Sequence, residues 1–152
     1  MTPGLVTPSP AVAPAPVVID TNIVLDIWVY LDSATPSLLN ALEEGKLHWL
    51  ATVSMREELL RVLDYPHIAQ RRNREGVSAE AVLAHFDRLA QMHPIAPKAP
   101  YVCKDEDDQK FIDLAAAHQA LLLSKDKQVL RLTSRLARLG VAVRQKWVLC
   151  DS

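Results

Sequence analysis

The chain has 152 residues, of which 49% are hydrophobic and 23% are charged, and its formal net charge is −1. This length suits one domain with a substantial core, and the composition excludes a disordered or collagen-like chain. No run approaches the roughly 18 apolar residues of a spanning helix, so we expect no membrane insertion. Because the net charge is close to zero, a nucleic-acid partner would need a local basic patch.

The first 16 residues differ in composition from the rest of the chain. They contain half of the ten prolines, with alanine and small polar residues between them. Proline fixes φ and removes a backbone donor, so this segment favours extended conformations over a helix. We therefore expect residues 1–16 to form a Pro/Ala-rich tail of low order, ahead of a single domain over residues 17–152.

The two cysteines, Cys103 and Cys150, are too few for a disulfide framework or a four-ligand zinc site. We expect both to be free thiols, which fits a reducing environment and a cytoplasmic protein. The chemistry of the protein must then come from other side chains.

Short apolar runs mark the expected strands. Val17–Ile19 is a β-branched run that ends at Asp20, and it is typical of a buried central strand. Further strands are expected at 47–51, at 121–123, near Ile95, and at a sheet edge formed by 141–143 or 147–149.

Helical periodicity fills the intervals between these runs. A first helix is expected to run through Trp28 with Asn22 or Thr21 as its cap, and a second from Pro36 to Gly45. A third is expected to open at Ser54 with Glu57 in a capping box, and a fourth to follow Ser78 as its cap. A fifth, capped by Asp107 or Asp108, is expected to run through His118, and the last to cover 127–139. Pro66 is expected to interrupt the chain before a basic stretch. Strands that alternate with helices predict an α/β fold, a three-layer α/β/α sandwich with a central parallel sheet.

Three carboxylates fall at related places in this arrangement. Asp20 ends the first strand, Asp126 lies just past the strand at 121–123, and Asp108 begins the helix that runs back to that strand. Open α/β sheets place their ligand crevice at the carboxyl ends of the strands. We therefore expect the three acids to meet there, although helix capping is an ordinary alternative role for Asp108 and Asp126.

Carboxylates that cluster in this way repel one another. At 4 Å the repulsion is about 4 kcal/mol per pair at an effective dielectric constant of 20. Such a cluster needs protonation, basic neighbours or a bound cation. Oxygen ligands favour hard cations such as Mg²⁺ or Mn²⁺, which also bridge to phosphate. The acids therefore predict a metal site that acts on phosphate esters.

Four acidic segments follow one another in order along the chain. They read V-V-I-D-T-N at 17–22, E-L-L-R-V-L at 58–63, C-K-D-E-D-D-Q-K-F at 103–111 and L-L-S-K-D-K at 122–127. Together they resemble the PIN-domain ribonuclease family, and especially the VapC-type toxins of bacterial toxin–antitoxin systems. The resemblance extends from Val17 to about Leu139.

The resemblance implies a PIN-like nuclease domain over 17–152. It implies catalytic roles for Asp20, Glu58, Asp108 and Asp126, with Mg²⁺ or Mn²⁺ held by the three aspartates and Glu58 acting directly or through water. The implied reaction is the hydrolysis of RNA phosphodiester bonds by a water molecule that the metal activates.

Several neighbouring residues leave alternatives open. Glu57 competes with Glu58, and the two lie about 100° apart on a helix, so only one can face the pocket easily. Asp105 and Asp107 could replace or assist Asp108. Many relatives have another acid where this chain has Gln128, which weakens a second metal site. The short polar residues Thr21, Asn22 and Ser124 could orient an acid or a water molecule.

An RNA substrate requires a positive surface, and the last predicted helix offers one. Lys125 and Lys127 flank Asp126, and Arg131, Arg135 and Arg138 recur at helical spacing after them. This row is expected to contact backbone phosphates, with a merely solvated helix face as the alternative. Two other groups are assigned no function: the arginines at 71, 72 and 74 as ordinary surface, and Trp28, Trp49 and His118 as core.

The resemblance also implies partners. It indicates the toxin component of a toxin–antitoxin pair, with an RNA substrate, a cognate antitoxin protein that blocks the acidic pocket, and a homodimer. The alternative is a catalytically degraded PIN-fold module that binds RNA or protein. A haloacid-dehalogenase-type phosphatase is disfavoured because Asn22 stands where that chemistry needs a second aspartate. A receiver domain is disfavoured because it needs an acidic pair near Asp20.

Overall fold

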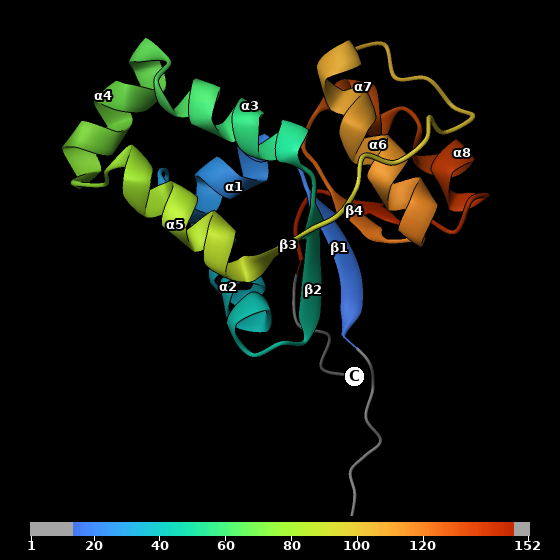
Figure 1. The fold of residues 1–152 in the computed structure, drawn as a ribbon, viewed down its shortest axis with the longest axis horizontal. Helices are drawn as coiled ribbons and strands as arrows, with labels where there is room; N and C mark the ends of the chain where they lie inside the picture. The colour runs from blue at the N-terminus through green and yellow to red at the C-terminus, as the bar shows by residue number, and fades with distance from the viewer. Residues whose placement is uncertain (1–13, 148–152) are drawn as a thin grey trace, which may run out of the picture.

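The computed structural model describes residues 14–147, which form a five-stranded parallel sheet between two layers of helices (Figure 1). The strands are β1 (Ala15–Ile19), β2 (Leu47–Ala51), β3 (Ala90–Met92), β4 (Leu121–Leu123) and β5 (Val143–Arg144). Their order in the sheet is β3-β2-β1-β4-β5, and every adjacent pair is parallel. The predicted α/β sandwich is confirmed.

Eight helices connect the strands in the described residues. They are α1 (Thr21–Trp28), α2 (Pro36–Glu43), α3 (Val53–Leu63), α4 (Pro66–Glu75), α5 (Ala79–Leu89), α6 (Glu106–His118), α7 (Lys127–Leu130) and α8 (Thr133–Ala137). Figure 1 shows α1 to α5 on one side of the sheet and α6 to α8 on the other. None of these helices has the length and apolar character needed to cross a bilayer.

The order of the strands creates a crevice between β1 and β4. From β1 the chain moves outward to β2 and β3, whereas from β4 it moves in the opposite direction to β5. The connections that follow these two central strands therefore diverge, and such a switch point is where open α/β sheets bind ligands. Asp20 directly follows β1, and Ser124 directly follows β4.

The core fills the sheet on both faces. Val17 and Val18 of β1 and Leu122 of β4 have no exposed surface, as expected for central parallel strands covered by helices. On the α1–α5 side, the Trp28 and Trp49 rings stack at 6.0 Å between centroids, which confirms that both tryptophans are core. The core therefore holds the carboxyl ends of β1 and β4 in fixed positions.

Local signals placed several helices correctly. Pro36 lies in the first turn of α2, and Gly45 follows that helix with a positive φ of 75°, a conformation that glycine adopts without strain. Ser78 caps α5, because its hydroxyl accepts a hydrogen bond from the Ala81 N–H at 3.0 Å.

Other local predictions were wrong or incomplete. Ser54 lies inside α3, which begins at Val53, so the Ser54–Glu57 capping box does not form. The interruption expected at Pro66 is present, because α3 ends at Leu63 and a turn at 64–65 follows, but Pro66 also starts α4, where its missing N–H is tolerated. The helix expected over 127–139 is two short helices, with a break at Arg131 and Leu132 between α7 and α8.

Two helix caps also differ from the prediction, and a third agrees with it. The N-cap position of α1 is Asp20, whereas Thr21 and Asn22 lie within the helix. Asp105, not Asp107 or Asp108, caps α6 and accepts the Asp107 N–H at 3.0 Å. Asp126 caps α7, as its alternative role anticipated. The cap of α6 was predicted wrongly because the acidic stretch at 105–108 offers several equivalent candidates within one turn.

Predictions for the edge strands and the ends of the chain were partly right. The short strand expected near Ile95 is β3 at Ala90–Met92, and the last strand is β5, of which only Val143 was expected. His118, expected in the core, is exposed and packs against the His93 ring. Cys103 is a buried free thiol. Residues 1–13 of the expected tail, the strand candidates 148 and 149, and Cys150 lie outside the described residues, while Ala15 and Pro16 begin β1.

Truncating Leu122 tests the importance of β4 for the sheet. Leu122 has no exposed surface and pairs with both β1 and β5, so Leu122→Ala should leave a cavity and lower the free energy of unfolding by about 2–5 kcal/mol. Leu60→Ala on α3 is the matched control, since Leu60 is 45% exposed and should cost less than about 0.5 kcal/mol. Urea unfolding measures both, and equal losses would contradict this account.

Candidate active site

Asp20 is held rigidly at the carboxyl end of β1. Its backbone N–H donates to the Leu123 carbonyl oxygen at 2.9 Å, which extends the β1–β4 pairing by one residue. Its side chain is buried, and Oδ2 accepts a hydrogen bond from the Ser124 hydroxyl at 2.7 Å. Burial raises the pKa of this carboxyl above its ordinary value, although the bond from Ser124 opposes the rise.

Ser124 links two of the acids. Its side chain is fully buried, and its hydroxyl oxygen accepts the Asp126 backbone N–H at 3.1 Å while the hydroxyl donates to Asp20. One serine thus fixes the carboxylate of Asp20 and the chain direction at Asp126. This geometry supplies a physical basis for the orienting role expected of Ser124.

Asp105, Asp108 and Asp126 bring their carboxylates together. One oxygen from each lies within 4.8 Å of the other two, a spacing that a single cation can bridge. Asp105 is exposed and Asp126 is half-buried, whereas Asp108 is only 6% exposed. Asp126 also accepts the Gln128 N–H at 2.8 Å, so it both caps α7 and faces the other acids.

Asp108 is the acid of this cluster whose charged form is least favourable. Its Oδ2 is buried and has no hydrogen-bond partner among the described residues. Burial, followed by the charges of Asp20 and Asp126, raises the pKa of Asp108 from 3.8 to about 8. A carboxylate in this position is stabilised by a cation, so the buried free oxygen fits a metal ligand.

Of the two neighbouring glutamates on α3, only Glu58 lines the acidic pocket. Glu58 is half-buried on α3 and lines the acidic pocket, whereas Glu57 is exposed and is not among the lining residues. Lys110 of α6 forms an ion pair with Glu58 Oε1 and also donates to the Asp107 carbonyl oxygen at 2.5 Å. Glu58 is therefore held by a lysine rather than by the three aspartates that lie closest together.

Lys110 was missed by the sequence analysis, as were Arg61 and Tyr65 at the same pocket. A signal for Lys110 does exist in the chain, since it is the first cation after an unbroken run of four acidic residues at 105–108. The pairing itself joins residues 52 positions apart on two helices, and no local pattern indicates that contact.

The acids share one pocket of about 190 Å³ at the carboxyl edge of the sheet. Its lining contains every acid proposed from the sequence: Asp20, Glu58, Asp105, Asp107, Asp108 and Asp126. Thr21 and Asn22 line it as well, and Ser124 contacts it through Asp20. The expected convergence of these residues is thus present.

The basic residues expected along one helix are divided between two short helices. Arg131 is the C-cap of α7 and Arg135 lies in α8, and both line a hollow with Lys104, which precedes the N-cap of α6. Lys127 is exposed beside Asp126, but Lys125 instead forms an ion pair with Asp26. Arg138 does not line that hollow.

The arginines of α4 have structural roles. Arg71 pairs with Glu75 at 3.1 Å, and Arg72 donates to the Leu63 carbonyl oxygen at 3.0 Å. Arg74 is exposed, so this group is consistent with the ordinary surface that the sequence analysis assigned to it.

Comparison with known families identifies the domain. The family model described as the PIN domain matches residues 16–128, a range that includes all the acids of the pocket. The chain belongs to the PIN-domain family. PIN domains are generally nucleases, and the acidic cluster of this member fits a divalent metal site. No curated protein matches the chain.

Raising the pH should destabilise the metal-free protein through Asp108. Its pKa is 3.8 in a model peptide and about 8 in the folded protein, so the unfolded chain releases this proton first. Stability should therefore fall as the pH rises from about 4 to about 8, and then level off. Thermal unfolding with a chelator present measures the profile.

Asp108→Asn removes this titration and should flatten the dependence of Tm on pH across that window. Asp107→Asn is the matched control, because Asp107 is exposed on the same helical turn. Profiles that are identical for the wild type and Asp108→Asn would show that the Asp108 carboxyl does not titrate in this way.

Proposed function

We propose that this PIN domain is a metal-dependent endoribonuclease that hydrolyses RNA phosphodiester bonds. The observation that carries the proposal is the buried Oδ2 atom of Asp108, which has no partner among residues 14–147 and lies in a cluster with Asp105 and Asp126. Free carboxylate oxygens on several elements, directed into one pocket, suit a hard cation better than any role in folding.

Asp108 and Asp126 are the central metal ligands in this proposal. Asp20 is the third ligand expected from the sequence, and Asp105 is the nearer candidate by distance. Asp20 lines the same pocket, with Oδ2 bonded to Ser124. The donors are all carboxylate oxygens, a set that favours Mg²⁺ or Mn²⁺ over softer metals.

A divalent cation bound there would lower the pKa of a water molecule and offset charge on the scissile phosphate. The side chains prepare that site without supplying a nucleophile. Ser124 holds the Asp20 carboxylate, and Lys110 holds Glu58 at the rim. Thr21, Asn22 and Asp107 line the pocket where they can orient a water molecule or the sugar–phosphate backbone.

The RNA strand is proposed to reach the acids across a basic surface. Lys127 lies on α7, Arg131 follows that helix and Arg135 lies on α8, and Lys104 lines the same hollow as the two arginines. These cations can contact backbone phosphates without reading sequence. They also offset the repulsion between RNA and the acidic pocket.

We further propose a biological setting of the VapC type, on the four motifs described in the sequence. The chain would then be the toxin of a toxin–antitoxin pair, with a cognate antitoxin that covers the acidic pocket, and it would form a homodimer. Residues 17–152 would constitute one nuclease domain.

A second candidate is a PIN-fold module with degraded catalysis that binds RNA or protein. It is favoured by the ion pair that engages Glu58 with Lys110, and by Gln128 at a position where another acid would strengthen a second metal site. Such a module would bind RNA without cleaving it.

Cleavage of a generic RNA with Mn²⁺ or Mg²⁺ distinguishes the two candidates. We expect cleavage that requires metal, and a loss of about 100-fold or more in Asp20→Asn because the acid cluster loses a charge. Glu58→Gln should lose about 10- to 100-fold, whereas Glu57→Gln, the adjacent exposed control, should keep wild-type activity. RNA binding without any metal-dependent cleavage would support the binding module instead.

Metal should also stabilise the fold, because it binds the native acids and relieves their repulsion. At about 100 times its Kd, Mn²⁺ should raise Tm by about 5–10 °C. Asp126→Asn should reduce this rise to less than half. Asp64→Asn serves as the control, since its side chain is 75% exposed and should leave the rise intact. A metal response that is equal in both variants would contradict the assigned site.

A further inference from the structure

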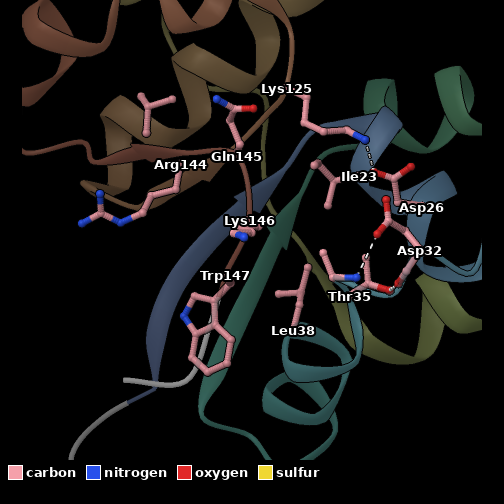
Figure 2. A pocket seen from close by; sticks show the side chains of 12 residues that line it. Ile23, Asp26, Asp32, Thr35, Leu38, Lys125, Arg144, Gln145, Lys146 and Trp147 are labelled. Carbon is pink, nitrogen blue, oxygen red and sulfur yellow. Dashed lines mark hydrogen bonds and ion pairs between the residues drawn. The ribbon is translucent and has the colours of Figure 1, made fainter. Parts of the chain in front are cut away.

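A second cavity, larger than the acidic pocket, lies elsewhere in the described residues. It has a volume of about 620 Å³ and lies between α1, α2 and the chain that follows β5. Figure 2 shows two walls that face each other, one formed by Ile23, Asp32 and Leu38, and the other by Lys146 and Trp147. Volumes of this size are typical of sites that bind small molecules or one unit of a polymer.

This cavity lies next to the acids along the chain. Lys125 lines it and pairs with Asp26, whereas the next residue, Asp126, lines the acidic pocket. Ser124, on the other side of Lys125, bonds to Asp20. The connection 124–126 therefore contributes a residue to each cavity, so an RNA strand that passes over it would contact both.

The lining combines an apolar floor with an aromatic ring. Ile23, Leu38 and Val143 form buried apolar surface, and Trp147 is half-buried at the side of the cavity. Nucleobases are flat and stack on aromatic side chains whatever their sequence. The amide of Gln145 and the hydroxyl of Thr35 supply polar groups at the same cavity.

The charges at the cavity favour a nucleotide over an apolar peptide. Three cations line it, Lys125, Arg144 and Lys146, against the two carboxylates of Asp26 and Asp32. Asp26 is matched by Lys125, and one oxygen of Asp32 accepts the Ala34 N–H at 2.8 Å. Arg144 and Lys146 are exposed and form no ion pair within residues 14–147.

We propose that this cavity binds one nucleobase of the single-stranded RNA substrate, stacked on Trp147, with the adjacent phosphate on Lys146. The proposal rests on the proposed ribonuclease function and adds a subsite to it. The base would be unstacked from its neighbours, as in most sequence-selective recognition of single-stranded RNA. The subsite would fix the strand so that a phosphate nearby in the chain enters the acidic pocket.

Binding of a fluorescent single-stranded RNA hexamer to the full chain tests the subsite. The protein carries Asp20→Asn to prevent cleavage, and Mg²⁺ is present. Adding Trp147→Ala should weaken binding by about tenfold, the loss expected for one stacked base. Adding Lys146→Ala should lower the salt dependence of binding by about one phosphate contact.

Tyr30→Ala is the matched aromatic control. The Tyr30 ring packs beneath the Arg71 guanidinium, 5.0 Å from its centroid, and does not line the cavity, so RNA affinity should not change. Hexamers that lack one base at successive positions give the second measurement. With the base missing at the position bound by the cavity, Trp147→Ala should no longer change the affinity.

The outcomes separate this proposal from the function on which it rests. If RNA binds but Trp147→Ala leaves its affinity unchanged, the subsite is overturned, the nuclease assignment stands, and a protein segment becomes the candidate occupant. If Trp147→Ala weakens every hexamer equally, including all those lacking a base, stacking is excluded. If the Asp20→Asn protein binds no RNA at all, the proposed ribonuclease function fails first.

Discussion

Repulsion between buried carboxylates is the physical constraint around which this domain is arranged. Asp108 bears most of it, because its free oxygen is sealed from water beside Asp20 and Asp126. The neighbouring contacts each relieve part of the cost: a serine hydroxyl bonds to Asp20, and a backbone N–H bonds to Asp126. These contacts do not neutralise the cluster, and an unrelieved charge of this kind is expected where a protein keeps a site ready for a ligand.

The parallel sheet is what allows such a costly cluster to persist. The strand order diverges between β1 and β4, so the segments after both strands meet at one edge above a closely packed interior. The core around Trp49 and Leu122 stabilises the sheet independently of that edge. A destabilising site can therefore be maintained without loss of the fold, a division common in enzymes.

Much of this arrangement follows from the sequence because it depends on topology. Apolar runs locate β1, β2 and β4, and the rule that ligands bind at carboxyl ends then brings Asp20, Asp108 and Asp126 together. The place of each acid relative to the strands is sufficient for this prediction, because the carboxyl ends of parallel strands lie at the same edge of the sheet. The exact third member of the close cluster, Asp105, depends on side-chain distances that no pattern reveals. The local failures have a different cause, because several neighbouring acids can cap the same helix, as at the start of α6.

The boundary of the family match divides the molecule in an informative way. All the acids of the acidic pocket lie within the matched residues 16–128. Val143 to Trp147, which form one wall of the larger cavity, lie beyond this match. Substitutions in that last segment can reshape the cavity while leaving the backbone of β1 and the start of α6 untouched. On the proposed function, substitutions in this final segment would change which RNA is preferred and leave the acidic pocket as it is.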